Sequence, residues 1–210
     1  MWHLVRAWLF PVWCIGCGRP DAGLCGDCAG AIGPAPPFNV GGMPVRAAGS
    51  YAGPVRDAIV AMKRGERAYL DPLAELAAPL VPAGAVLVPV RTTAGRAAER
   101  GFDQAVALAL RIARLRDASC ADILCKRGGP QRGRGRVERL AAQGRFSLRR
   151  GVAVPPRALL FDDVVTTGAT LTDAAATLAA AGCRVEGAVV VARTPPGRET
   201  PRAGSRLLEA

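Results

Sequence analysis

The sequence predicts an α/β protein in which helices cover both faces of a mostly parallel sheet. Short apolar runs alternate with segments of helical spacing along most of the 210 residues, and this alternation is typical of βαβ units. Half of the residues are apolar, which is enough for a sizeable core. We therefore expect one α/β domain of ordinary size, preceded by a small cysteine-rich module.

Three regions of the chain differ in composition. Residues 1–43 contain an apolar arm, the cysteine-rich segment and, over 30–42, a stretch rich in Pro and Gly that we expect to be a linker or an irregular strap. Residues 44–194 carry the regular pattern of the α/β domain, and the Pro-rich, charged tail over 195–210 is expected to be flexible. Because no apolar stretch is long enough to span a membrane, we expect no membrane insertion and a cytoplasmic location.

The spacing of apolar residues predicts the individual elements. Short apolar runs favour strands, and apolar residues repeated every three or four positions favour helices. In chain order these are a strand over 45–53, helices over 55–63 and 70–80, a strand over 85–90, a helix over 102–115, a strand over 159–164, a helix over 170–181 and a strand over 184–192. Asp71 is expected to cap the second helix, with Pro72 as its first residue, and Gly182 to cap the end of the last helix.

The segment LLFDDVVTTGATL, residues 159–171, carries the most specific chemical pattern. An apolar run without alternation, typical of a strand buried on both faces, ends in Asp162 and Asp163. Carboxylates at the end of a strand can accept hydrogen bonds from sugar hydroxyls, and the following Thr-Thr-Gly-Ala-Thr turn opens a helix whose N–H groups favour an anion. The simpler interpretation is a capped helix, with Thr170 and Asp173 as a capping box, but it leaves the acid pair unexplained.

Two C-x-x-C pairs near the start of the chain predict a tetrahedral zinc site. The ligands would be Cys14, Cys17, Cys25 and Cys28. Four thiolates close the coordination sphere, so the role of the metal would be structural. The alternatives are two disulfides or a redox dithiol, and both fit poorly with an odd total of seven cysteines and no export signal.

The charge of the chain favours a polyanionic partner. Lys and Arg number 28 against 17 Asp and Glu, which gives a net charge of +11. Much of the surplus lies in residues 126–150, where Lys126 and eight Arg face one acid, Glu138. Gly and Pro interrupt this stretch, so we expect a mobile loop without a core element. Its partner could be a phosphorylated substrate or a nucleic-acid backbone, and an inert solvated loop is the third interpretation.

Taken in order, several segments resemble the ComF family of bacterial competence-associated proteins, a branch of the type I phosphoribosyltransferase-like proteins that includes GntX-type members. They are the paired C-x-x-C at 14–28, SYAGPVRDAIVAMK at 50–63, VPVR at 88–91, ERGFDQ at 99–104 and FDDVVTTGAT at 161–170. The chain departs from the family pattern at Arg91, where a second Pro is common, and at Asp103, where Asn is common. The resemblance implies the type I phosphoribosyltransferase fold for the α/β domain.

The resemblance also implies a ligand, 5-phosphoribosyl pyrophosphate (PRPP) or a related ribose phosphate, bound with Mg²⁺. Asp162 and Asp163 would contact the ribose hydroxyls. The 5-phosphate would lie in a cradle made of Thr166, Thr167, Gly168, Ala169 and Thr170. The basic stretch would close over the pyrophosphate as a flexible hood, with Lys126, Arg127, Gln131 and Arg132 as the catalytic candidates.

Further residues outside these segments are candidates for contact with the substrate. Arg91 follows the strand over 85–90, where the loop would meet pyrophosphate, although a solvated arginine is an equal alternative. Arg100 and Gln104 could position the substrate or form a structural hydrogen-bond network. Lys63 could touch the ligand or snorkel from a helix end. The only histidine, His3, is remote in sequence from the phosphate turn and is not expected to act as a base.

Two functions of different classes follow from these observations. The first is a phosphoribosyltransferase acting on an unidentified acceptor. The second is a protein of DNA uptake or processing that uses the fold as a nucleotide sensor or as a module for single-stranded DNA or for other competence proteins. The sequence leaves the acceptor and the oligomeric state open.

Overall fold

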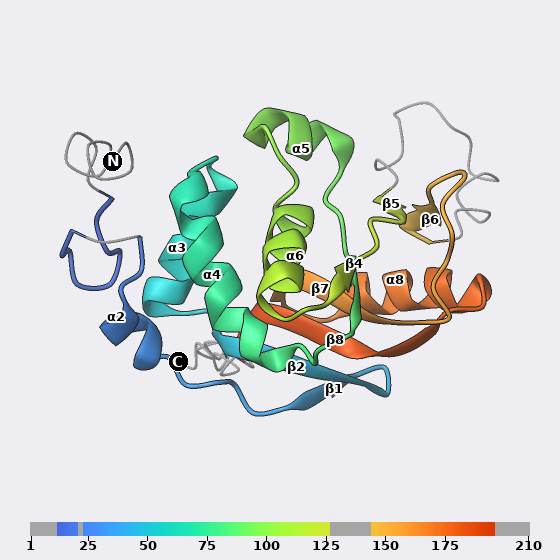
Figure 1. Cartoon of the computed structure of the whole chain (residues 1–210), viewed down its shortest axis with the longest axis horizontal. Helices are drawn as coiled ribbons and strands as arrows, with labels where there is room; N and C mark the ends of the chain where they lie inside the picture. Colours follow the sequence, from blue (N-terminus) through green and yellow to red (C-terminus); the bar gives the residue numbers. More distant parts are fainter. Residues whose placement is uncertain (1–11, 21–22, 127–143, 196–210) are drawn as a thin grey trace, which may run out of the picture.

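The computed structural model describes residues 12–20, 23–126 and 144–195. They form an α/β fold around a six-stranded sheet with the strand order β1-β2-β8-β7-β3-β4 (Figure 1). In that order the strands are β1 (Phe38–Val40), β2 (Met43–Ser50), β8 (Arg184–Arg193), β7 (Arg157–Val165), β3 (Val86–Pro89) and β4 (Ser119–Cys120). All neighbouring pairs except β1 and β2 are parallel, so the expectation of a mostly parallel sheet is confirmed.

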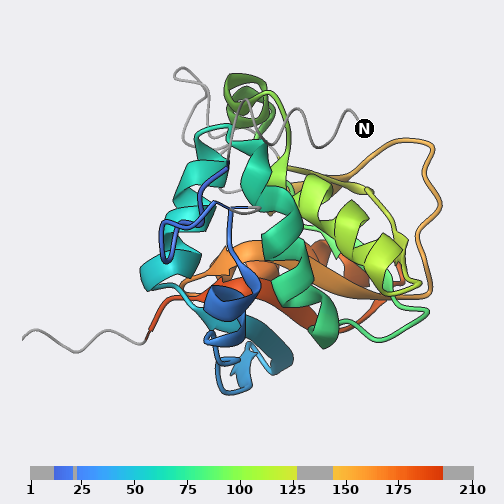
Figure 2. The same cartoon turned by 60° about the vertical axis from the view of Figure 1, so that its left-hand side comes forward.

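Helices pack on both faces of this sheet, which also confirms the sequence prediction. One face carries α3 (Gly53–Lys63), α4 (Leu70–Ala77) and α6 (Gln104–Leu115), and the other carries α8 (Ala169–Ala180) (Figures 1 and 2). Alternate residues of β7 divide between the two cores, since Phe161 packs on the α3–α4–α6 side and Leu160 on the α8 side. Among the described residues, no helix has both the length and the apolar character to cross a membrane.

One helix and one strand that border the site are among the elements without a counterpart in the prediction. Helix α5 (Ala94–Arg100) buries none of its residues, so it lacks the apolar periodicity from which helices are inferred. It ends at Gly101 with φ +74, the left-handed conformation that favours glycine at helix ends. Strand β1 lies within the stretch over 30–42 that was predicted as a linker. That prediction is wrong at Phe38–Val40, which pairs antiparallel with β2 at the edge of the sheet.

The ends of two helices differ from the predicted ends. Helix α4 begins at Leu70 with Tyr69 as its N-cap, so Asp71 and Pro72 lie inside the first turn. A 3₁₀ turn over Arg67–Tyr69 runs directly into the helix, because Tyr69 and Leu70 are both buried in the core. Proline is tolerated there, since the N–H groups of the first turn have no partner within the helix.

Helix α8 also begins and ends differently from the prediction. It begins at Ala169 with Gly168 as its N-cap, so Thr170 does not cap it and the capping-box interpretation is wrong. At the other end Ala181 is the C-cap, and Gly182 follows it with φ +82. The helix therefore ends one residue earlier than predicted, and Gly182 lies directly after the C-cap, where glycine is common.

The basic stretch over 126–150 contains part of a small two-stranded sheet. Strand β6 (Phe146–Leu148) pairs antiparallel with β5 (Leu124–Lys126). Phe146 is 2% exposed and packs in the core on the α8 side, so the expectation of no core element is wrong at this point. One buried aromatic among many charges gives too little periodicity to reveal a strand of three residues.

Candidate functional site

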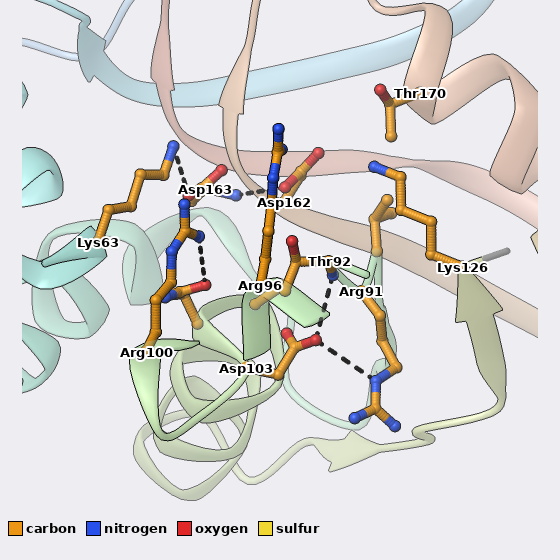
Figure 3. A pocket seen from close by; sticks show the side chains of 13 residues that line it. Lys63, Arg91, Thr92, Arg96, Arg100, Asp103, Lys126, Asp162, Asp163 and Thr170 are labelled. Atoms are coloured by element: carbon orange, nitrogen blue, oxygen red, sulfur yellow. Dashed lines mark hydrogen bonds and ion pairs between the residues drawn. The ribbon is translucent and has the colours of Figure 1, made fainter. Parts of the chain in front are cut away.

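A cavity of about 150 Å³ opens beyond the carboxyl ends of β7 and β3 (Figure 3). It is lined by Lys63, Val90, Arg91, Thr92, Arg96, Arg100, Asp103, Gln104, Ala105, Lys126, Asp162, Asp163 and Thr170. Five of these side chains are basic and three are carboxylates. The excess of positive charge suits an anionic ligand, and the edge of the sheet is the one at which α/β proteins bind ligands.

The acid pair lies near the carboxyl end of strand β7 and lines this cavity. Asp162 and Asp163 lie on β7, and the Nζ of Lys63, the last residue of α3, is 2.8 Å from Oδ2 of Asp163. Burial raises the pKa of the Asp162 carboxyl well above its usual value, and the neighbouring Asp163 carboxylate raises it further. The two carboxyl groups therefore differ in their electrostatic surroundings. Asp163 is paired with the Lys63 cation, whereas desolvation disfavours the charged form of Asp162.

The threonine–glycine turn connects β7 to α8 beside the acid pair. Gly168 has φ +80, and a Cβ atom built there would lie 2.3 Å from Cγ1 of Val40 on β1, so both the backbone angle and the close contact require glycine. The N–H of Ala169 donates to Thr167 Oγ1 at 3.4 Å. Apart from that of Ala169, the N–H groups in the first turn of α8 have no partner within the helix and so remain available to an anion.

The five predicted cradle residues do not contribute equally. Thr170 is half-buried and lines the cavity, whereas Thr166, Thr167 and Ala169 are exposed. Gly168 is buried against β1. The turn as a whole therefore borders the cavity at Thr170, with its other side chains open to solvent.

Arg91 lines the cavity, but its guanidinium is engaged by protein carboxylates. Its Nε lies 3.4 Å from Asp103 Oδ2 (Figure 3). Its Nη1 lies 3.0 Å from Asp122 Oδ2. Asp103 also accepts hydrogen bonds from the N–H of Thr92 at 3.1 Å and from the N–H of Val106 at 3.3 Å. One carboxylate thus caps α6, holds the loop after β3 and pairs with Arg91.

Arg100 and Gln104 lie next to each other at the α5–α6 side of the cavity. The Nη1 of Arg100 donates to Gln104 Oε1 at 3.0 Å, and Gln104 is 2% exposed. Sequence reasoning offered either substrate positioning or a structural network for this pair, and the geometry combines a mutual hydrogen bond with a place in the cavity wall.

Of the four predicted hood residues, Lys126 is at the cavity. It lies on β5, and its Nζ is 5.5 Å from the centroid of the Phe146 ring. Arg127, Gln131 and Arg132 lie outside the described residues, as does His3. Arg96 was missed by sequence reasoning, because the short exposed helix α5 that carries it leaves no apolar pattern.

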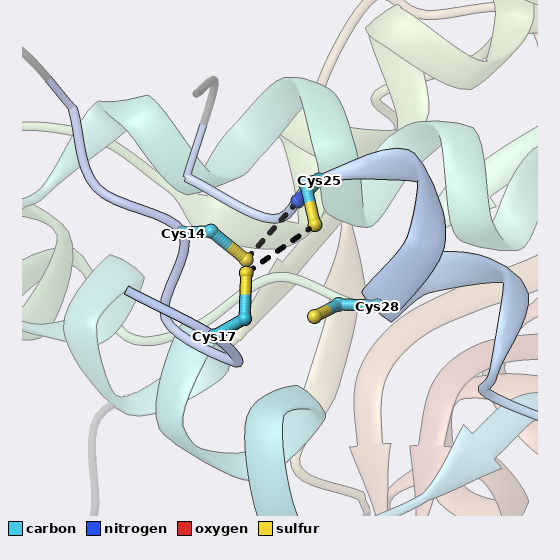
Figure 4. Close-up of side chains that lie close together, drawn as sticks. All are labelled: Cys14, Cys17, Cys25 and Cys28. Atoms are coloured by element: carbon cyan, nitrogen blue, oxygen red, sulfur yellow. Dashed lines mark hydrogen bonds between the residues drawn. The ribbon is translucent and has the colours of Figure 1, made fainter. Parts of the chain in front are cut away.

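The four N-terminal cysteines form a second site, away from the cavity (Figure 4). Their Sγ atoms all lie within 4.8 Å of one another, and the Sγ atoms of Cys17 and Cys25 are 3.7 Å apart. Zn–S bonds of about 2.3 Å in a tetrahedron place neighbouring sulfurs about 3.8 Å apart, so the cluster fits zinc. The pKa of Cys14 is lowered to about 6, chiefly by the backbone N–H of Cys25, which lies 3.3 Å from Cys14 Sγ. This favours the thiolate that a metal needs.

The cysteine cluster is attached to the α/β core through apolar contacts. Ile15 and Ile32 pack both against the buried cysteines and against the core on the α3–α4–α6 side. Gly16 allows a close approach, since a Cβ atom there would lie 2.8 Å from Cys28 Sγ.

A search of protein-family models with this sequence gave no match, and neither did a search of curated proteins.

Proposed function

We propose that the cavity binds PRPP, or a related ribose phosphate, as in the type I phosphoribosyltransferase-like proteins that the sequence resembles. Asp162 and Asp163 would accept hydrogen bonds from ribose hydroxyls, and the turn ending at Thr170 would surround the 5-phosphate. The observation that carries the proposal is that both carboxylates and Thr170 line one basic cavity at the carboxyl edge of the sheet. Phosphate suits the start of α8, where unpaired N–H groups and the helix dipole favour negative charge.

The acid pair is also of the chemical kind that suits Mg²⁺. This ion prefers oxygen ligands and is usually held by one or two carboxylates together with phosphates of the substrate. Asp163 is paired with Lys63, whose Nζ lies 2.8 Å from its Oδ2. Asp162 is therefore the carboxyl group with more freedom to face a metal–phosphate complex. Bound Mg²⁺ would supply positive charge next to the pyrophosphate.

Turnover, in this proposal, is displacement of pyrophosphate from C1 of the ribose. The bond from C1 to the pyrophosphate oxygen breaks, its electron pair leaves with pyrophosphate, and a nucleophilic acceptor forms a new bond to C1. The acid pair would orient the ribose through its hydroxyl groups. The cavity cations Arg96, Arg100 and Lys126 would stabilise the negative charge that develops on the leaving group.

The charge of the chain supports a second candidate, binding of single-stranded DNA in uptake or processing. The net charge is +11, and the stretch over 126–150 holds many of the arginines. Residues 127–143 lie outside the described residues, so this candidate depends on sequence alone. The enclosed acid pair has no counterpart in backbone binding, where cations alone suffice, and we therefore place the small ligand first.

The test of the proposed function is calorimetry with ribose 5-phosphate and with PRPP at constant Mg²⁺. Asp162→Asn combined with Asp163→Asn is expected to weaken both affinities at least about tenfold, because hydrogen bonds from ligand hydroxyls to carboxylates are lost. Asp71→Asn is the matched control, since Asp71 is an exposed carboxylate on α4 paired with Arg111.

A titration of single-stranded DNA at two salt concentrations separates the two candidates. The double variant should bind DNA as the original protein does, because phosphate backbone contacts come from cations. Unchanged ribose 5-phosphate binding in the double variant would contradict the proposed function. An equal loss of DNA and sugar phosphate binding would contradict the separation of the two sites.

A further inference from the structure

The two C-x-x-C turns of the cysteine cluster are joined by a side chain that is not a metal ligand. Figure 4 shows the four sulfurs turned toward one another, two from each C-x-x-C pair. Arg19 follows the first pair, and its Nε donates to Cys17 Sγ at 3.4 Å. Its Nη2 donates to Cys25 Sγ, of the second pair, at 3.8 Å. One guanidinium therefore contacts a sulfur of each pair.

The backbone around the first C-x-x-C pair holds Arg19 in this place. The N–H of Gly18 donates to the carbonyl of Cys14 at 2.8 Å, and the N–H of Cys14 donates to the carbonyl of Arg19 at 2.7 Å. Gly18 has φ +72, a left-handed angle that glycine adopts without strain. Trp13 and Pro20 form an antiparallel bridge that closes this turn. The position of Arg19 thus follows from the same turn that aims the first two sulfurs.

A carboxylate beside the second pair orients the guanidinium. Asp27 lies in the first turn of α2 (Gly26–Gly30), and its Oδ2 lies 2.5 Å from Nη2 of Arg19. Both side chains are exposed, 61% for Arg19 and 80% for Asp27. Ion pairs that are this exposed contribute little to stability, because water screens them. The ion pair alone therefore does little to hold the two C-x-x-C turns together.

The charge of a metal-loaded cluster gives the same arginine a larger effect. Four thiolates outweigh the charge of one Zn²⁺ ion, so the centre is negative as a whole. A cation that donates to two of the sulfurs opposes this charge and stabilises the thiolates that bind the metal. Removal of such outer partners of metal ligands typically weakens metal binding about 10–100-fold.

We propose that Arg19 is a positioning residue of the metal centre, which holds the Cys17 and Cys25 thiolates and sets the affinity of the cluster for zinc. The Asp27 carboxylate keeps the guanidinium in place through its ion pair. This role concerns the cysteine cluster alone and does not depend on the ligand of the cavity. Substitution of Arg19 should therefore weaken zinc binding and leave the stability of the metal-free protein unchanged.

The zinc affinity of the reduced full chain, measured by competition with a chromophoric chelator, tests this role. Arg19→Gln is expected to raise the dissociation constant for zinc about tenfold or more. Arg19→Lys keeps the charge and should recover at least part of the loss. Arg157→Gln is the matched control, because Arg157 is likewise exposed and pairs with a carboxylate, Glu186, but lies at the start of β7. A loss in Arg19→Lys as large as in Arg19→Gln would overturn the role of the charge.

Melting temperatures distinguish this role from a merely structural one. At a fixed concentration of free zinc, Arg19→Gln should melt about 3 °C or more below the original protein, and in excess chelator the two should melt together. Destabilisation of equal size in both conditions would mean that Arg19 only fastens the two turns, and it overturns the proposal. An unchanged dissociation constant in Arg19→Gln overturns it too, as does an original protein that binds no zinc.

Discussion

At the scale of single residues, the site is organised by carboxylates with different partners. Asp103 holds backbone N–H groups of the loop after β3 and of α6, and Asp163 holds Lys63. Asp162 is half-buried beside the Asp163 carboxylate, and its desolvation together with that neighbouring charge raises its pKa. Hydrogen bonds from ligand hydroxyls, or a bound metal, would stabilise the charged form of Asp162. The carboxyl group whose charge costs stability without a ligand is therefore the one placed for binding.

This arrangement predicts how stability depends on pH. The folded pKa of Asp162 lies above its unfolded value of about 4, so the folded state keeps the proton longer and its contribution to stability falls as pH rises through that window. Asp162→Asn removes this loss. The difference in the free energy of unfolding between Asp162→Asn and the original protein should therefore grow in favour of the variant from pH 4 upward, as measured by urea denaturation.

Asp71→Asn, at an exposed position, should show no such growth. Parallel stability curves for Asp162→Asn and the original protein across this range would show that burial of Asp162 carries no cost.

At the scale of elements, the approach of β1 to the start of α8 fixes the shape of the phosphate turn. Val40 fills the space beside Gly168, and the N–H of Thr172 donates to the carbonyl of Gly168 at 3.0 Å. Strand β1 therefore supports the site although it contributes no residue to the cavity wall. Its three residues are short of the length at which a strand can be inferred from sequence.

Two glycines at the ends of α8 provide a matched test of this support. Gly168 and Gly182 have φ +80 and φ +82, but an added Cβ meets Val40 in the first case and nothing within 4 Å in the second. Gly182→Ala should cost about 1–2 kcal/mol for the left-handed backbone alone. Gly168→Ala should cost about 1–3 kcal/mol more because of the clash, and should also weaken ribose 5-phosphate binding.

Thermal or urea denaturation of both variants, with calorimetry of the folded proteins, measures these effects. Equal destabilisation by the two substitutions would mean that β1 moves to accommodate the added Cβ atom and does not fix the shape of the turn.

At the scale of the whole molecule, the cysteine cluster and the cavity are separate sites joined by one core. Ile15 and Ile32 connect the cluster to the α3–α4–α6 side, and α3 ends at Lys63 in the cavity. The N-terminal segment thus braces the helix that supplies the partner of Asp163. We infer that zinc, if bound by the four thiolates, stabilises the fold without taking part in ligand binding.

Metal removal tests this inference. Chelation, or Cys28→Ser, is expected to lower the melting temperature by roughly 5 °C or more, since binding of a structural metal contributes directly to folding. The affinity for ribose 5-phosphate should change less than about threefold in protein that remains folded. Cys125→Ser serves as the control, because Cys125 is half-buried and outside the cluster. Freshly purified, reduced protein that contains no zinc would contradict the metal assignment.

The sequence by itself determined the elements that are buried and regular. The apolar run before Asp162 gave β7, the spacing of the helices gave α3, α6 and α8, and the mostly parallel sheet followed from their alternation. The adjacency of acid pair and glycine turn, and the spacing of the cysteines, are local features, so they too could be predicted from sequence. Local patterns report burial and local geometry, because both repeat over a few residues.

Only the tertiary structure decided which side chains meet. The pairing of Lys63 with Asp163, the engagement of Arg91 by Asp103 and Asp122, and the contact of β1 with Gly168 join residues far apart in the chain. Helix α5 buries none of its residues, and β1, β5 and β6 have three residues each, so none of them leaves a pattern in the sequence. The free energy of such contacts depends on where the sheet places the ends of its strands, and that arrangement is set by packing across the whole core.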